Sequence, residues 1–321
     1  MTAPSLGGTA DVGTDVRRAT HRIRWGQWIA RIIVVLIALS IIKFLITSPN
    51  FEWSVVWAWF RAPSIGKALW TTLWLSAVSM AIGLVFGVLV AVARMAPNRL
   101  VNGLASVYVW FFRGTPLLVQ LIFWFNLAAL LPQISISIPF GPDLVSWDTN
   151  KVITPVTAAI LGLGLNEVAY MAEIIRGGLL SVDPGQREAA KAFGMNSTRA
   201  MRRVVLPQAM RAIIPPTGNQ LINMVKATAM VSVIAMSDLL YTVQSVYNRT
   251  FQTIPLLMVA VIWYLIVTTV LNIAQSFIEY YFARGSGTHD TSFAAMITNW
   301  LKGRRRPTRS VEVPLKTGEH A

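Results

Sequence analysis

Polar and charged side chains interrupt several long apolar runs of this sequence. Such groups are costly in an apolar environment unless they have partners or face water, so they indicate a functional path. Two of them, Glu167 and Lys226, are an acid and a base that together would complement a zwitterionic ligand. The uncharged candidates for the same path are Gln120, Asn166, Tyr170, Asn219 and Asn223. The alternative is that the charges pair with each other, or lie at the ends of the apolar runs, and only hold the helices together.

The spacing of these residues predicts two polar helix faces. Asn166, Tyr170 and Glu173 recur at helical intervals, with Glu167 beside them. Glu173 is also close to Arg176 in the sequence, which favours a place at the edge of the apolar run. A second stripe with comparable spacing is formed by Asn219, Asn223 and Lys226.

Residue types that carry out catalysis or hold metals are scarce in the sequence. It has no cysteine, and its 3 histidines all lie in polar terminal segments. It has neither a glycine-rich phosphate loop ending in Lys-Ser/Thr nor a zinc-binding histidine pair. We therefore expect no catalytic site, no metal site and no cofactor in this chain.

The composition indicates a membrane protein. Of the 321 residues, 54% are hydrophobic and only 13% are charged, whereas about a quarter are charged in a typical soluble domain. The formal net charge of +14 is compatible with nucleic-acid binding, but the basic residues occupy short segments between long apolar runs. That distribution is typical of membrane topology, so we expect no nucleic-acid partner.

Six apolar runs are long enough to cross a bilayer as helices. They cover residues 28–46, 69–93, 104–131, 156–175, 218–236 and 256–277. The fold class is therefore all-α, a polytopic membrane helix bundle of about six transmembrane helices. In the second run, Gly83 and Gly87 form a small-xxx-small pair that lets helices approach closely. A cleaved signal peptide is the alternative for the first run, although no small-residue cleavage site follows it.

The third run is interrupted by the residues Arg113-Gly114-Thr115-Pro116. Glycine and proline prevent one continuous helix here, and a half-helix that begins after them would point its positive end inward, toward an anionic group. The alternative is a kink that lets the helix bend around a neighbour. For Arg113 we expect an anchoring role at the end of the helix rather than contact with a substrate.

The basic residues predict the orientation of the spans. Clusters of them precede the first run, follow the second, fill the segment after the fourth and follow the last. The segments on the opposite side hold only Arg61, Lys67, Lys151 and Arg249. By the positive-inside rule, both termini are expected in the cytoplasm and the chain in the plasma membrane.

The polar segment of residues 181–210 predicts two short helices joined by a turn. Asp183 can cap the first helix, and Pro184 suits its first position. Gln186 stands where the partner of a capping box would, and Gly194 ends the helix.

A second cap signal follows at Asn196-Ser197-Thr198. It predicts a basic helix over residues 199–205, which ends before Leu206-Pro207 because proline interrupts helical hydrogen bonding. The two short helices would then meet at a glycine corner.

This segment resembles the EAA loop of bacterial ABC importer permeases. The matching residues, at the family's spacing, are Glu188-Ala189-Ala190, Gly194, Val204 and Leu206-Pro207. Val204 stands where an isoleucine is usual in the family, which is a conservative departure. Two further stretches, residues 112–117 and 169–178, look like signatures of the polar amino acid subgroup.

The resemblance covers residues 65–283 and implies an ABC importer permease domain with its EAA loop at 181–210. Three parts of the chain lie outside it: a basic N-terminal segment (1–27), an extra transmembrane helix (28–47) and a basic tail (284–321). Within the tail, apolar residues at helical spacing predict an amphipathic helix over 292–302, lying on the anionic cytoplasmic leaflet. A disordered basic tail is the alternative.

The resemblance implies that the EAA loop docks on a cytoplasmic ATPase and transmits its movement to the spans. The residues that match this coupling role are Asp183, Pro184, Glu188, Ala189, Ala190, Gly194, Arg202, Leu206 and Pro207. Alternating access driven by ATP is then the implied mechanism, with ATP and magnesium bound by the ATPase rather than by this chain.

The resemblance also implies a set of partners. These are two copies of the ATPase subunit, a second copy of this permease or a similar one, an extracytoplasmic solute-binding protein, membrane lipid and an amino acid substrate. The alternative function is a self-contained secondary transporter or channel, in which Glu167 and Lys226 would serve an ion or proton gradient. Dependence of transport on ATP and on a separate ATPase distinguishes the two.

Overall fold

The structure is a computed structural model that describes residues 25–137 and 143–283. The chain falls into two compact units, one ending at Phe51 and the other beginning at Glu52. Two of the expected parts, the basic segment before residue 25 and the amphipathic helix of residues 292–302, lie outside the described residues.

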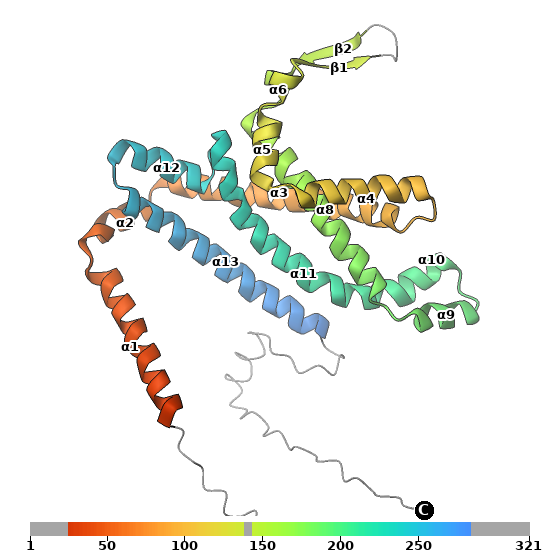
Figure 1. The fold of residues 1–321 in the computed structure, drawn as a ribbon, viewed down its shortest axis with the longest axis horizontal. Helices are drawn as coiled ribbons and strands as arrows, with labels where there is room; N and C mark the ends of the chain where they lie inside the picture. Colours follow the sequence, from red (N-terminus) through yellow and green to blue (C-terminus); the bar gives the residue numbers. More distant parts are fainter. Residues whose placement is uncertain (1–24, 138–142, 284–321) are drawn as a thin grey trace, which may run out of the picture. The chain divides into compact units, whose positions relative to one another are not determined.

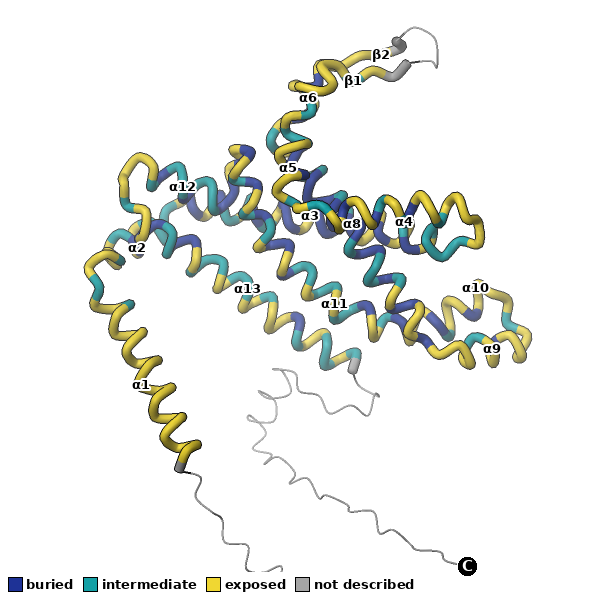
Figure 2. The backbone as a smooth tube through the Cα atoms, in the orientation of Figure 1, coloured by how far each residue is buried: buried dark blue, intermediate teal, exposed yellow. Residues whose placement is uncertain are grey.

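The first unit contains one long helix, α1 (Trp25–Thr47), followed by a short 3-10 helix, η2 (Pro49–Phe51). Nearly all side chains of α1 are exposed, and most of them are apolar (Figure 2). A helix that is apolar on every face requires lipid around it. α1 is long and apolar enough to cross a membrane, as expected for the first apolar run.

The second unit is a set of helices with one β-hairpin among its described residues (Figure 1). Before the hairpin come α2 (Trp53–Phe60), α3 (Pro63–Arg94), α4 (Arg99–Gly114), α5 (Leu117–Phe125) and α6 (Leu127–Leu130). The hairpin pairs β1 (Gln133–Ser137) with β2 (Asp143–Asp148) antiparallel, and α7 (Thr149–Val152) and α8 (Pro155–Leu180) follow. Then come α9 (Pro184–Ala192), α10 (Ser197–Ala200), the π-helical turn η3 (Met201–Val205), α11 (Leu206–Ala227), the 3-10 helix η4 (Thr228–Ile234), α12 (Leu239–Thr250) and α13 (Thr253–Ala283).

The described helices provide four to six candidate membrane spans, against about six expected. α1, α3, α8 and α13 are each long and apolar enough to cross a membrane. Two bent pairs bring the number to six if each pair is counted as one span: α4 with α5, bent by 100°, and the helix from Ser197 to Ile234 with α12, bent by 46°. The all-α membrane bundle is therefore confirmed. The break after Gly114 produces a separate helix, α5, in a new direction rather than a shallow kink.

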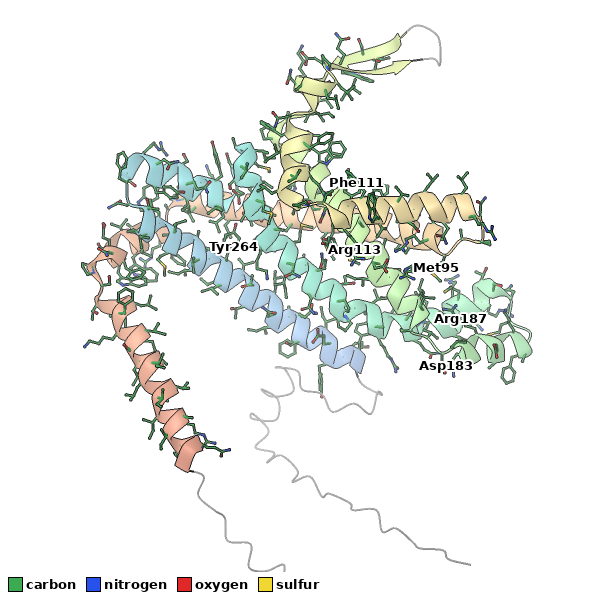
Figure 3. All side chains as sticks on the ribbon, in the orientation of Figure 1. Met95, Phe111, Arg113, Asp183, Arg187 and Tyr264 are labelled. Carbon is green, nitrogen blue, oxygen red and sulfur yellow. The ribbon has the colours of Figure 1, made fainter. Side chains whose placement is uncertain are left out.

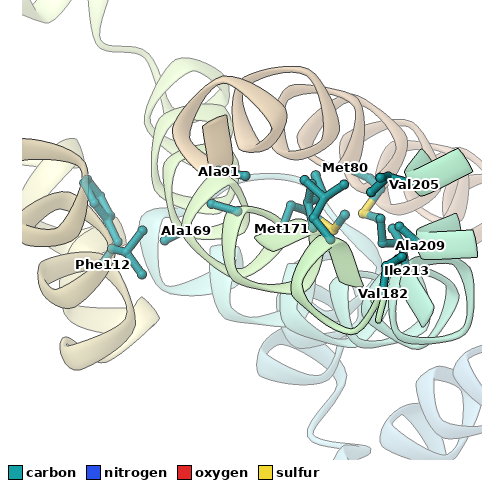
Figure 4. Packing of buried hydrophobic residues seen from close by; sticks show 13 residues of the cluster. Met80, Ala91, Phe112, Ala169, Met171, Val182, Val205, Ala209 and Ile213 are labelled. Carbon is teal, nitrogen blue, oxygen red and sulfur yellow. The ribbon is translucent and has the colours of Figure 1, made fainter. Parts of the chain in front are cut away.

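α8 is the central helix of the second unit, and α3 crosses it closely. Gly83 and Gly87, the two glycines of α3 that were expected to allow this contact, lie at the crossing. Gly83 packs on the side chain of Glu167, and a Cβ added at Gly87 would lie 2.7 Å from the Cβ of Met171. Side chains of α3, α8 and α11 then meet in one buried cluster, which includes Met171 and Ile213 (Figure 4). The glycine pair therefore sets the distance between α3 and α8, the two most buried of the four single-helix candidate spans.

Two local expectations for the polar segment are wrong. Gln186 does not complete a capping box, because its side-chain oxygen accepts a hydrogen bond from Gln208 Nε2 (3.4 Å) instead. The helix also does not end before Leu206-Pro207 but continues without interruption into α11. Because Pro207 has no N–H to donate, the chain passes it through η3, where the N–H of Leu206 donates to the carbonyl of Met201.

Candidate functional site

The expected glycine corner is present between α9 and α10. Asp183 caps α9, and its Oδ1 accepts a hydrogen bond from the N–H of Gly185 (2.6 Å). At the other end the N–H of Met195 donates to the carbonyl of Ala190 (3.0 Å) and that of Gly194 to Lys191 (2.9 Å). Gly194 has φ +72°, so this is the left-handed helix end that glycine favours.

The second side of the corner is capped as well. Asn196 Oδ1 accepts a hydrogen bond from the N–H of Arg199 (2.9 Å), which starts α10. Ala190 and Ala200 are buried, whereas Glu188 and Ala189 are exposed. One alanine of the EAA motif therefore packs inside the corner, and the glutamate and the other alanine remain on its surface.

The corner is connected directly to the spans. Arg187 Nη2 donates a hydrogen bond to the carbonyl of Leu179 in the last turn of α8 (2.5 Å). Figure 3 labels Asp183 and Arg187 where α8 passes into α9. Val182 and Val205, at the two ends of the corner, belong to the same buried cluster as α8 and α11. The corner is therefore packed against both spans.

Gln120 and Asn166 lie together at the break between α4 and α5. Gln120 Nε2 donates to the carbonyl of Phe112 (3.0 Å) and to Thr115 Oγ1 (2.7 Å). Asn166 Nδ2 reaches the same Phe112 carbonyl from α8 (2.9 Å) and also Gln120 Oε1 (3.3 Å). The two amides satisfy a backbone carbonyl that the broken helix leaves without its own partner, so in this structure they hold the break in place.

Glu167 is almost fully buried, with 1% of its surface exposed, at the crossing of α3 and α8. Its Oε2 accepts a hydrogen bond from Gln220 Nε2 of α11 (3.2 Å). Its Oε1 has no hydrogen-bond partner among the described residues. Gln220 was not among the expected path residues; the only signal for it in the sequence is its position beside Asn219 in an amide pair.

The second expected stripe lies on α11 but points away from the core. Asn219, Asn223 and Lys226 are all exposed, and no ion pair to Lys226 occurs among the described residues. The structure therefore does not bring Lys226 to Glu167 within one subunit. The stripe is a polar face on a helix that otherwise belongs to a membrane span.

The part of α8 nearest the glycine corner between α9 and α10 carries a cluster of charged groups. Glu173 forms an ion pair with Arg94, the last residue of α3, and a second one with Arg176 Nη2 (2.5 Å). The guanidinium of Arg113 lies over the ring of Tyr170, 5.3 Å from its centre. Arg94, Arg113, Tyr170 and Glu173 line a pocket of about 400 Å³ between α4 and α8. The sequence pointed to the Glu173–Arg176 pair but not to Arg94.

A second pocket, of about 460 Å³, lies on the α10 side of the glycine corner. It is lined by Asn196, Thr198, Arg199, Arg202 and Arg203. Among the residues that the structure describes, no group of three or more His, Cys, Asp or Glu side chains could hold a metal ion. The lining of this pocket is therefore polar and basic.

The sequence matches one protein family over most of its length. A family model described as "Binding-protein-dependent transport system inner membrane component" matches residues 83–285. The chain is 42% identical over 263 residues to the arginine transport system permease protein ArgU of Corynebacterium glutamicum, covering 81% of each protein. It is 34% identical over 223 residues to the glutamine transport system permease protein GlnP of Escherichia coli, covering 70% of this chain and 94% of that protein.

Solved structures show the same relationship. A chain described as "Crystal structure of an amino acid ABC transporter with histidines" is 34% identical, with a TM-score of 0.60 over 72% of this chain and 98% of that one. The MetNI methionine ABC transporter, at 21% identity and a TM-score of 0.51, shares the fold. The present chain therefore belongs to the family of binding-protein-dependent transport system inner membrane components, as a permease subunit of an ABC importer and not itself a catalytic enzyme.

Proposed function

We propose that this permease carries polar amino acids inward across the membrane, driven by a separate ATPase subunit that binds the corner of α9 and α10. The observation that carries the proposal is this corner, in which both helix ends are capped and Glu188 faces outward. Its position directly after α8 and before α11 suits an element that transmits movement to two spans. The coupling residues are those of the EAA motif and its caps, from Asp183 to Pro207.

The polar face of α11 supports the proposal that a second permease subunit binds to this one. Asn219, Asn223 and Lys226 are exposed on a membrane span, where polar groups are costly unless they face water or a partner. A path between two permease subunits, either two copies of this chain or this chain with a similar one, would place the stripe in a water-filled passage. Lys226 is then available to the carboxylate of an amino acid.

An amino acid substrate is supported by two independent features. The relatives ArgU and GlnP are named for arginine and glutamine transport, and both substrates carry an ammonium and a carboxylate. In this chain Glu167 offers a buried carboxylate, one oxygen of which accepts no hydrogen bond from residues 25–137 or 143–283, and this suits an ammonium group. Alternating access would have to open the α3–α8 crossing to expose it, with Asn166, Tyr170 and Gln120 lining the same route.

The remaining partners follow from the family. Two ATPase subunits would bind ATP and magnesium, a solute-binding protein would deliver the amino acid from outside, and this chain would hold no cofactor. The α9–α10 segment and both termini would lie on the cytoplasmic side, a proposal that the excess of basic residues around α9 and α10 and in the terminal segments supports. The comparisons do not favour a self-contained transporter, because the relatives are subunits of transport systems.

The test is copurification of the tagged chain from membranes in mild detergent, with Glu188→Lys prepared in parallel. We expect an ATPase subunit to be recovered with the wild-type chain and lost with the variant, because a cation replaces an exposed carboxylate of the docking surface. Proteoliposomes containing the complex should take up an amino acid only with ATP and the solute-binding protein. A chain that purifies alone and transports without ATP would overturn the proposal.

A further inference from the structure

Phe193 is an exposed aromatic residue in a polar part of the chain. Its side chain is 84% exposed, although it lies outside every candidate span, where lipid would cover it. Most other strongly exposed apolar side chains belong to α1, α3, α4 and α13, which are membrane helices. Phe193 is therefore an apolar side chain on the surface of the same corner for which an ATPase contact is proposed.

The backbone around Phe193 is fixed on both sides. Its own N–H donates to the carbonyl of Ala189 (3.0 Å), and the left-handed Gly194 follows it directly. Asn196 then begins the next helix with a side-chain cap. No ring contact to Phe193 occurs among the described residues. The ring is therefore held out from a rigid corner, and binding through it would require little ordering of the backbone.

The surface around this ring is basic. Lys191 is exposed beside it on α9, and the pocket on α10 and η3 is lined by Arg199, Arg202 and Arg203. None of these groups forms an ion pair among the residues that the structure describes. A complementary partner would offer an apolar socket bordered by acidic side chains, which is the arrangement of a binding hot spot with a polar rim.

We propose that Phe193 is the apolar anchor by which this subunit binds its ATPase, entering an apolar socket with an acidic rim. This inference rests on the proposed function and adds an apolar contact residue to the docking surface. A lipid surface fits the corner less well. Glu188 is exposed on the same short helix, and one phenylalanine buries far less area than the continuous apolar face of a membrane-surface helix.

The experiment measures the affinity of the ATPase subunit recovered with the wild-type chain for purified permease variants in detergent. Phe193→Ala should weaken binding on the order of thirtyfold, the loss typical of a central aromatic anchor. Phe193→Leu, which keeps an apolar group, should retain most of the affinity. Phe251→Ala is the matched control, because Phe251 is 88% exposed but lies between α12 and α13, away from the corner. It should bind like the wild type.

A photoreactive phenylalanine analogue at position 193 gives a second measurement that does not depend on affinity. It should form a crosslink to the ATPase subunit in the assembled complex. If Phe193→Ala binds the ATPase as the wild type does while Glu188→Lys does not, the anchor role is wrong and the proposed function stands. Crosslinks to lipid alone would also overturn the anchor role. If the wild-type chain binds no ATPase, both the proposed function and the anchor role fail.

Discussion

Glu173 of α8 and Arg94 of α3 form an ion pair that joins two spans far apart in the sequence, on the side nearest the α9–α10 corner. Arg176 binds the other carboxylate oxygen, so one acid holds two guanidinium groups. The pair lies on the same two helices as the close crossing at Gly83 and Gly87. α3 and α8 are thus held together at two points, by glycine packing and by charge.

Removing the carboxylate of Glu173 should weaken the attachment of α3 to α8 by charge. Glu173→Gln keeps the size of the side chain but leaves Arg94 and Arg176 without their counter-ion. Both side chains are partly exposed, so we expect a coupling energy of only about 1 kcal/mol between Glu173 and Arg94. The measurement is a double-mutant cycle with Arg94→Gln, followed by thermal unfolding in detergent. Additive effects of the two substitutions would show that the pair does not stabilise the fold.

Glycine substitutions within α3 should have opposite effects at two positions. A Cβ added at Gly66 would meet open space. Gly66→Ala should therefore stabilise the helix by up to about 1 kcal/mol, the difference in helix propensity between glycine and alanine. Gly87→Ala should destabilise the protein, because the new methyl group would meet Met171 and push α3 away from α8. Thermal unfolding of the two variants against the wild type provides the comparison. Equal stabilisation by both would mean that the crossing is looser than the structure shows.

The amides at the α4–α5 break should matter for stability. Asn166→Leu removes one donor to the Phe112 carbonyl and buries an apolar group beside Gln120, which should cost about 1–3 kcal/mol. Asn126→Leu is the control, because Asn126 is exposed and bonds only within its own helix turn. Yield of folded protein and its unfolding temperature are the measurements. If both variants unfold alike, Asn166 is not needed to hold the break.

The sequence predicted the elements with short-range signals. Apolar length defined the spans, Gly83 and Gly87 marked the close crossing, and Gly194 with its flanking caps marked the corner. Each of these depends on residues within one or two helical turns. The continuation of the helix through Pro207 was missed, because a π-helical turn can absorb a proline and no local residue pattern announces one.

The roles of the polar residues were harder to predict, because periodicity identifies a helix face but not what it faces. Gln120 and Asn166 are brought together only by the fold, and they hydrogen-bond a backbone carbonyl. On α11 the spacing selected Asn219 and Lys226, which are exposed, whereas Gln220 is the residue that reaches α8. Whether these residues line a substrate path stays a prediction.

Glu167 gives the sharpest test of that path. Glu167→Gln keeps the size of the side chain and an oxygen that can accept the hydrogen bond from Gln220, so the fold should be retained. It removes the negative charge, so ATP-dependent uptake of the amino acid by proteoliposomes should fall at least about tenfold if the carboxylate receives an ammonium group. The measurement is the initial rate of uptake at saturating solute-binding protein.

Glu279→Gln is the matched control for this substitution. Glu279 of α13 likewise accepts a hydrogen bond from a glutamine, since Gln275 Nε2 donates to its Oε1 (2.8 Å). It lies near the end of its span rather than at the α3–α8 crossing, so its neutralisation should leave uptake unchanged. Loss of uptake in both variants would indicate a general need for these carboxylates in the bundle. Normal uptake in Glu167→Gln would show that the buried charge is not on the substrate route, and that Glu167 serves only to join α3, α8 and α11.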